Sequence, residues 1–309
     1  MLERRNFLKL ACASLSLSAL PGCGSQEDTA LLVPSTSSPS STTTPPGPSV
    51  VLNRVLAFDV AGVAYLLEPA LYRLSRLDSQ GAIVWQIGDP SRGDGLFNVP
   101  VNLESDASGR LYVVDEGNAE IDVISNQGVP LRVIGRGQLR SLGDIAIDIT
   151  RQLLYASEGV AHRISVFSLD GQLLRRFGSK GSGPTQLNSP DGVDVGPDGL
   201  LHVADCGNAR VQVFNQDGVW QRSYGRRGTE LGQLNLPGAL VITSTYQIFV
   251  TDAVEGFVTQ FDANGQPVSR FIPTLPDGRQ IQPEHLHLTP DNRLLISGTL
   301  AFAGSPQKS

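Results

Sequence analysis

Residues 178–225 decide the fold, and they read GSKGSGPTQLNSPDGVDVGPDGLLHVADCGNARVQVFNQDGVWQRSYG. Four short runs rich in β-branched and aromatic residues are separated by the turn sequences PDG, CGN and QDG; the runs are residues 191–195, 200–204, 211–214 and 220–224. Runs of this length broken by Asp-Gly and Gly-Asn predict consecutive antiparallel hairpins. The stretch is therefore a four-stranded meander, which cannot bury both of its faces without neighbours.

The rest of the chain supplies those neighbours as further copies of the same unit. Asp205, in the sequence HVADCGN, has acidic counterparts at matching places in other copies, and Ser297 takes the sixth place; these counterparts are Glu68, Asp115, Glu158 and Asp252. The intervals between successive positions are 47, 43, 47, 47 and 45 residues. A steady period in the forties with four strands per unit is typical of propeller blades.

The best copy, FGSKGSGPTQLNSPDGVDVGPDGLLHVADCGNARVQVF, resembles an NHL repeat, and GRLYVVDEGNAEIDVI in the second unit is the next most similar. The resemblance extends over residues 52–300 and implies an all-β, six-bladed β-propeller. It implies little about function, because this fold is a scaffold for many activities. The sixth unit has too few strands, so we expect a short last blade or one completed by residues 50–52. We favour the second arrangement, because closing the ring removes exposed sheet edges.

The N-terminal region predicts export and anchoring rather than folded structure. Residues 1–23 resemble a twin-arginine lipoprotein signal peptide, with Arg4, Arg5, Phe7 and Leu8 in the export motif and Cys23 as the lipidated residue. An ordinary cleaved signal with an incidental cysteine is the alternative. The apolar run at 8–20 is shorter than the roughly 20 residues that span a bilayer. Residues 24–49 are rich in Ser, Thr and Pro, which predicts a disordered tether to a propeller at 50–309.

Charge and cysteine content narrow the range of partners. The formal net charge is −6, and removal of the basic leader makes the remainder more acidic still. An acidic exported domain argues against nucleic acid and against binding to anionic lipid, so we expect membrane contact through the anchor only. Beyond the leader Cys206 is the sole cysteine, and no histidine or aspartate pattern indicates a nucleophile there. We expect a monomer in the cell envelope, on a membrane that faces the periplasm or the exterior.

The recurrent acidic residues predict a structural role, because a residue repeated in every blade serves the blade. We expect these carboxylates to accept backbone N–H groups in the turns that follow them. A binding site is more plausible in the central channel, which the first strand of each blade lines. Aligning the units places one set of residues in a first ring, and a second ring lies three positions later; the charged and histidine members are Arg54, Asp144, Asp191 and Glu284, then Glu104, Asp194 and His287.

Carboxylates that converge in a channel suit a hard cation such as calcium, although a water-filled acidic channel is the simpler interpretation and Arg54 can instead pair with one of the acids. Glu284, His285 and His287 form the only histidine cluster, and alternate strand positions place both imidazoles on one face, which suits zinc. No third histidine ligand is evident. We therefore expect no cofactor, with calcium or zinc as the alternative.

Two functions remain open at the level of sequence. The first is a lipid-anchored, non-catalytic module that binds a protein, peptide or glycan partner, and it rests on the leader, the tether and the lack of a catalytic motif. The second is a metal-dependent propeller hydrolase or lyase, lactonase-like or amidating-lyase-like, whose site lies in the channel. It would use the acidic residues and His287 named above.

Overall fold

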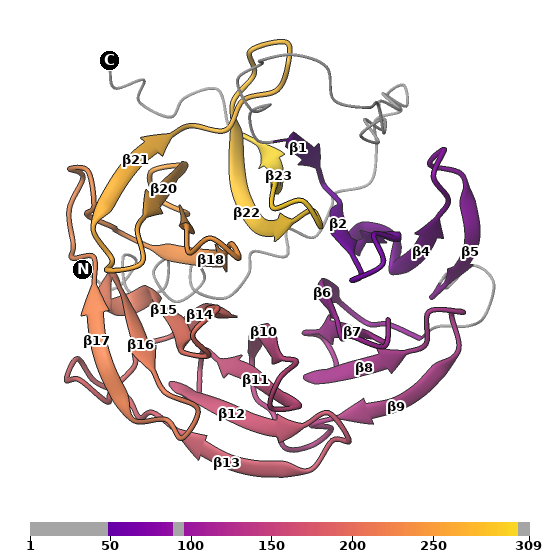
Figure 1. Cartoon of the computed structure of the whole chain (residues 1–309), viewed down its shortest axis with the longest axis horizontal. Helices are drawn as coiled ribbons and strands as arrows, with labels where there is room; N and C mark the ends of the chain where they lie inside the picture. Colours follow the sequence, from indigo (N-terminus) through magenta and orange to yellow (C-terminus); the bar gives the residue numbers. More distant parts are fainter. Residues whose placement is uncertain (1–48, 89–95, 302–309) are drawn as a thin grey trace, which may run out of the picture.

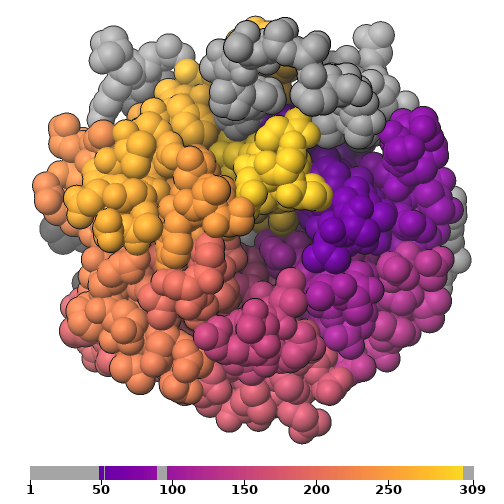
Figure 2. All heavy atoms as spheres, viewed as in Figure 1, coloured from indigo at the N-terminus to yellow at the C-terminus, as the bar shows by residue number. Residues whose placement is uncertain are grey.

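The computed structural model describes residues 49–88 and 96–301, and in this part of the chain the fold is all β (Figure 1). Six sheets follow one another around a ring, and the space-filling view shows a hollow at its centre (Figure 2). The predicted six-bladed propeller is confirmed. Within the described ranges no helix has the length and apolar character needed to cross a membrane. The predictions for Cys23 and for Arg4, Arg5, Phe7 and Leu8 lie outside these residues.

Five blades are four-stranded antiparallel meanders whose strands follow the sequence outward from the channel. Blade 1 holds β2 (Val55–Phe58), β3 (Ala64–Glu68), β4 (Arg73–Leu77) and β5 (Ile83–Ile87), with the short helix η1 (Pro69–Leu71) between β3 and β4. Blade 2 holds β6 (Pro100–Ser105), β7 (Leu111–Asp115), β8 (Glu120–Ile124) and β9 (Pro130–Ile134). Blade 3 holds β10 (Leu142–Asp148), β11 (Leu153–Glu158), β12 (Arg163–Ser168) and β13 (Leu173–Phe177).

Blades 4 and 5 repeat this order. Blade 4 holds β14 (Pro190–Val195), β15 (Leu201–Asp205), β16 (Arg210–Phe214) and β17 (Trp220–Tyr224), with η3 (Cys206–Asn208) between β15 and β16. Blade 5 holds β18 (Pro237–Ile242), β19 (Ile248–Asp252), β20 (Phe257–Phe261) and β21 (Pro267–Phe271). The strands predicted from the repeat at 178–225 agree with blade 4 to within about one residue, the usual uncertainty of element ends.

Blade 6 closes the ring by joining the two ends of the folded domain. It holds β22 (Ile281–Leu288), β23 (Leu294–Leu300) and β1 (Ser49–Leu52), and β1 pairs with β23 in parallel. The register places Val50 opposite Ile296 and Val51 opposite Ser297. The expected completion of the last blade by the N-terminal strand is confirmed, and the blade has three strands in the described residues.

The hydrophobic core lies between neighbouring blades rather than within one of them. The cluster between blades 3 and 4, for example, combines Tyr155 and Val166 with Val193, Val203 and Phe214. Each sheet therefore buries both faces against its neighbours, which explains why one repeat cannot fold alone.

Meander topology gives the ring two distinct ends. One end, which we call the loop face, carries the connections between blades and the turns between second and third strands, such as residues 135–142, 178–190, 225–237 and 206–209. The other end, the turn face, carries the first and third turns of each blade, where Asp-Gly sequences such as Asp217-Gly218 lie.

Candidate functional site

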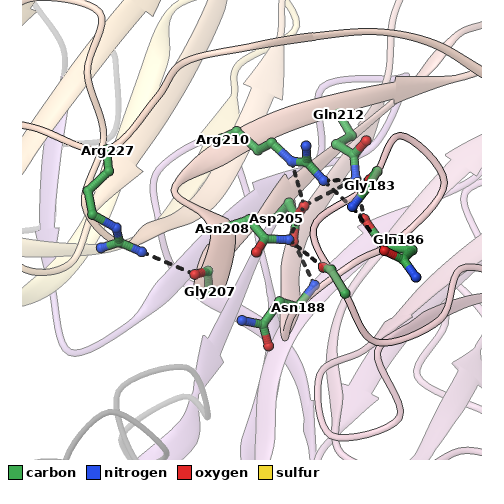
Figure 3. Close-up of polar contacts among 10 residues, drawn as sticks. Gly183, Gln186, Asn188, Asp205, Gly207, Asn208, Arg210, Gln212 and Arg227 are labelled. Carbon is green, nitrogen blue, oxygen red and sulfur yellow. Dashed lines mark hydrogen bonds and ion pairs between the residues drawn. The ribbon is translucent and has the colours of Figure 1, made fainter.

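The recurrent acidic residue of the blades is a buried hydrogen-bond acceptor, and Asp205 shows its role (Figure 3). One oxygen accepts the backbone N–H of Asn188 at 2.7 Å. The other accepts Asn208 Nδ2 and Arg210 Nε, both at 2.8 Å, and Gln212 Nε2 at 3.1 Å. Asp205 is 0% exposed, so these donors replace the water that a carboxylate loses on burial.

Two of the other recurrent acids hold their blades in the same way. Asp115 accepts the backbone N–H groups of Asn98 and Val99, and Asp252 accepts those of Asn235 and Leu236. The predicted structural role is confirmed, with a correction to the donors. Most of these backbone donors belong to the segment that enters the blade, about one strand pair earlier in the chain, although Asp115 and Asp252 also bind the turn that follows.

Arg54 does not reach the channel carboxylates. Its guanidinium lies 3.3 Å from Glu68, the recurrent acid of its own blade, which Arg73 also contacts at 2.8 Å. Arg54 therefore has a structural role in blade 1, as a partner of the recurrent acid Glu68.

The first strands bring four acidic side chains together at the channel, and the register of blade 3 differs from the sequence alignment by one residue. Ile145 pairs with Ala156, as Val193 pairs with Val203, each two residues before the recurrent acid. Asp144 therefore corresponds to Gly192, not to Asp191. The shift arises because the connection entering blade 3 is shorter and lacks the proline that begins β14.

Two of the channel acids join neighbouring blades. The Asp144 carboxylate accepts the backbone N–H of Ile145 at 2.8 Å and that of Val193, in the next blade, at 3.1 Å. Asp194 repeats the arrangement with Val195 and, in the next blade, Ile242, both at 2.7 Å. Burial raises the pKa of Asp144 to about 6, against the opposing effect of its hydrogen bonds.

Asn102 extends this chain of contacts and was missed from the sequence. Its Nδ2 donates to Asp144 at 2.7 Å, while its own oxygen accepts the N–H of Leu103. It occupies in blade 2 the place that Asp144 takes in blade 3. Only the corrected register reveals this equivalence, because Asn at this point has no distinctive sequence signal.

Glu104 and Asp191 complete the acidic group. Burial, followed by the charges of Asp194 and Asp144, raises the pKa of Glu104 well above its usual range. Burial, followed by Asp144 and Glu116, raises the pKa of Asp191 to about 7, and burial raises that of Asp194 to about 7. Burial and mutual repulsion thus favour the protonated form of these carboxyl groups.

The two histidines of β22 lie apart from that group. His287 pairs with Leu295, two residues before Ser297, so it corresponds to Val193 and not, as the sequence alignment placed it, to Asp194. Burial lowers the pKa of His285 to about 4, and burial together with His285 lowers that of His287 to about 3, so both imidazoles are neutral at pH 7. His287 Nε2 is buried without a hydrogen-bond partner in the described residues. Glu284 instead accepts a hydrogen bond from Thr299 Oγ1 at 3.1 Å; its side chain reaches solvent, but surrounding protein partly desolvates it and raises its pKa.

The described residues hold no group of three or more His, Cys, Asp or Glu side chains placed to bind a metal ion. The structure therefore brings Glu104, Asp144, Asp191 and Asp194 together, and places Arg54, Glu284 and the histidines in other surroundings. Chemically, the acidic group can hold protons or attract cations, and two of its members already tie blades together.

A further buried acid, Asp122, leads to a stability prediction. It is 4% exposed, and its Oδ2 has no hydrogen-bond partner in the described residues. Burial, then the charges of Glu120 and Asp115, raises its pKa to about 7. In blade 4 the same strand position holds Gln212, which donates to Asp205.

We expect Asp122→Asn to stabilise the protein by about 1–3 kcal/mol at pH 8 and to have little effect at pH 4. Unfolded Asp122 loses its proton near pH 4 and folded Asp122 near pH 7, so wild-type stability falls as pH rises between these values. Urea unfolding at both pH values, with Asp217→Asn at an exposed turn as control, measures the difference. Equal effects of Asp122→Asn at both pH values would contradict a buried protonated carboxyl group.

Comparisons with known proteins agree with this architecture. The family model for the NHL repeat matches residues 187–214, which include β14, β15, η3 and β16. A search of curated proteins found no significant sequence match. The chain is therefore a six-bladed β-propeller. More particularly, it is a propeller that contains an NHL repeat.

Several solved structures share the fold. Virginiamycin B lyase from Staphylococcus aureus aligns with a TM-score of 0.56 at 15% identity, covering 75% of this chain and 72% of that one. A streptogramin B lyase aligns with a TM-score of 0.58 at 13% identity, covering 79% and 90%. A chain of a nidogen/laminin complex aligns with a TM-score of 0.56 at 20% identity, covering 79% and 84%. At these identities the likeness concerns the fold alone.

Proposed function

We propose that this protein is an exported, lipid-anchored propeller that binds a protein, peptide or glycan partner without catalysis. The observation that carries the proposal is the use of its acidic residues. The recurrent acids hold the entering loops, and Asp144 and Asp194 hold the next blade. Residue types that often perform chemistry are thus engaged in support of a rigid ring, whose loop face is left as a binding surface. A fold neighbour belongs to a protein complex, that of nidogen with laminin.

Partner binding is testable by photo-crosslinking in the intact cell envelope. Val254, 62% exposed, lies in a turn of the loop face, and Val219, 56% exposed, lies in a turn of the turn face. A photoreactive residue at 254 should give a discrete crosslinked species, and one at 219 should not. If neither position 254 nor position 219 gave a crosslink, and Val160 on the loop face gave none either, the result would count against a binding role.

Anchoring at Cys23 gives a prediction of its own. Cells fed an alkyne-bearing palmitate should label the wild-type protein, and Cys23→Ser should abolish the label and release the protein from membranes. Two acyl chains are needed for stable anchoring, so their loss has a large effect. Cys12→Ser, the other leader cysteine, is the matched control. Label retained in Cys23→Ser would refute the anchor while leaving partner binding untouched.

A metal-dependent hydrolase or lyase with its site in the channel is the second candidate. It is favoured by His287 Nε2, which is buried without a hydrogen-bond partner in the described residues, by the raised pKa of Glu104 at the channel and by the fold shared with two lyases. Metal content of residues 24–309, purified without chelators, distinguishes the two. One tightly held calcium or zinc ion per chain, lost in Glu284→Ala or His287→Ala, would favour the enzyme and its lactone or amide substrates.

A further inference from the structure

The connection that enters blade 3 is shorter than those that enter blades 4 and 5. From Gly135 to Leu142 it has five fewer residues than the connections at 178–190 and 225–237. The two long connections fold over the loop face of the blades they enter, and their backbone carbonyl groups accept hydrogen bonds from arginine side chains there.

The long connections cover arginine side chains. In blade 4, Arg210 Nη2 donates to the carbonyl oxygens of Gly183 and Gln186 at 2.9 and 3.2 Å (Figure 3). In blade 5, Arg270 donates to the carbonyl oxygens of Thr229 and Glu230, both at 2.6 Å, and to that of Gln233 at 2.8 Å. Carbonyl groups of the loop backbone thus supply acceptors to each guanidinium, in addition to Asp205 for Arg210 and Thr259 for Arg270.

Blade 3 keeps both arginine positions and lacks most of the cover. Arg163 pairs with Glu158 across β12 and β11, as Arg210 pairs with Asp205, and Arg176 on β13 corresponds to Arg270 on β21. Arg176 retains one loop carbonyl, that of Gln138, at 2.9 Å. Within the part of the chain that the structure describes, Arg163 donates only to the Glu158 carboxylate, at 2.8 and 3.0 Å.

An open pocket of about 670 Å³ lies where the longer connection would run. Its polar lining includes Arg140, Arg163 and Arg176, and the exposed Val160 stands beside them. The backbone N–H of Arg140 binds Glu158, as Asn98, Asn188 and Asn235 bind the acids of their blades. Blade 3 therefore carries an arginine where three blades carry asparagine, and its guanidinium has no partner in the described residues.

The charge of this pocket selects a short anionic ligand. Three arginines line the pocket, and the buried carboxylate of Glu158 pairs with two of them, Arg163 and Arg176, whereas the chain as a whole has a net charge of −6. The overall charge repels an extended polyanion, while the local excess attracts one or two carboxylates. Guanidinium groups bind carboxylates with paired, charge-assisted hydrogen bonds. Val160, 70% exposed, adds an apolar contact beside them.

We propose that this pocket of blade 3 binds an acidic peptide segment of a partner protein, with glutamate or aspartate carboxylates in place of the missing loop carbonyls and an apolar residue against Val160. The proposal rests on the proposed binding function and names the place and chemistry of the contact. Arg140 supplies the uncommitted charge, and Arg163 and Arg176 supply donors held in position by Glu158, Ser165 and Gln138.

The test uses the full folded chain and a dye-labelled peptide, Glu-Glu-Leu-Glu-Glu, followed by fluorescence anisotropy at low salt. We expect saturable binding, loss of binding for Gln-Gln-Leu-Gln-Gln, and about tenfold weaker binding for Arg140→Asn, the loss of one charge-assisted contact. Arg140→Asn installs the residue that three other blades use, so the fold is retained. Arg226→Asn, an equal change of charge at an exposed residue of the 225–237 connection, should change affinity less than twofold.

Equal weakening by Arg140→Asn and Arg226→Asn, or equal binding of the glutamine peptide, would overturn the pocket. The cellular crosslinking experiment separates this result from the broader function. A partner that crosslinks from Val254 equally well in wild type and Arg140→Asn would leave partner binding intact and remove this site from it. Specific peptide binding without any cellular crosslink would leave the pocket in place and count against the proposed function.

Discussion

Replacing Asp205 by Ala is expected to lower the free energy of unfolding by about 3–5 kcal/mol. The carboxylate is fully buried and accepts hydrogen bonds from the connection that enters blade 4, from the turn that follows β15, and from two residues of β16. Its removal leaves the partly buried guanidinium of Arg210 without a counter-charge and leaves the Asn188 N–H without an acceptor. The cost therefore comes mainly from groups that remain unpaired.

Two further variants separate charge from hydrogen bonding at this position. Asp205→Asn keeps one acceptor oxygen but turns an amide NH₂ toward the donors of Asn208 and Arg210. It should therefore lower the free energy of unfolding by more than half of the amount expected for Asp205→Ala. Asp217→Ala, at an exposed turn, should change stability by less than about 0.5 kcal/mol. Urea unfolding of all three chains gives the comparison. A decrease in the free energy of unfolding below about 1 kcal/mol for Asp205→Ala would show that the blade does not require the hydrogen bonds of this carboxylate.

The role of Asp205 was predictable from sequence, and its partners were not. Recurrence at a period in the forties showed that the residue serves every blade. Asn188, whose N–H is the donor, lies just before the hairpin of β14 and β15, and Asp205 lies at the end of that hairpin. The pairing of the two strands brings the two residues together. Local turn chemistry predicted a backbone N–H donor in the turn that follows, whereas the turn contributes the side-chain amide of Asn208 instead.

The channel marks the limit of prediction by repeat alignment. The alignment of Asp191 and Asp194 agrees with the register of β14, because the proline that begins this strand fixes its start. Asp144 was displaced by one residue because blade 3 lacks that proline and has a shortened connection. The same shortening opens the arginine pocket. No sequence motif predicts this pocket, because each of its arginines appears in the sequence as an ordinary exposed charge.

A chain that begins at Asn53 is expected to melt about 10 °C below one that begins at residue 24, because it lacks β1. This strand supplies a parallel hydrogen-bond ladder to β23, from Ser49 opposite Leu295 to Leu52 opposite Gly298. Val50 packs against the cluster between blades 5 and 6, and Val51 against the cluster between blades 6 and 1. Removal of β1 therefore exposes both apolar surface and an open sheet edge.

A point substitution tests the same closure without changing chain length. Val50→Asp should reproduce at least half of the loss in melting temperature, because it places a charge against Ile296 and its neighbours in blade 6. Val268 on β21 is 54% exposed, so Val268→Asp is the matched control and should have little effect on the melting temperature. Calorimetry of the four chains, combined with light scattering, also reports association through the freed edge of β23. Equal melting temperatures for the two starting points would mean that blade 6 is stable with two strands, and that contacts of β22 and β23 with β2 close the ring unaided.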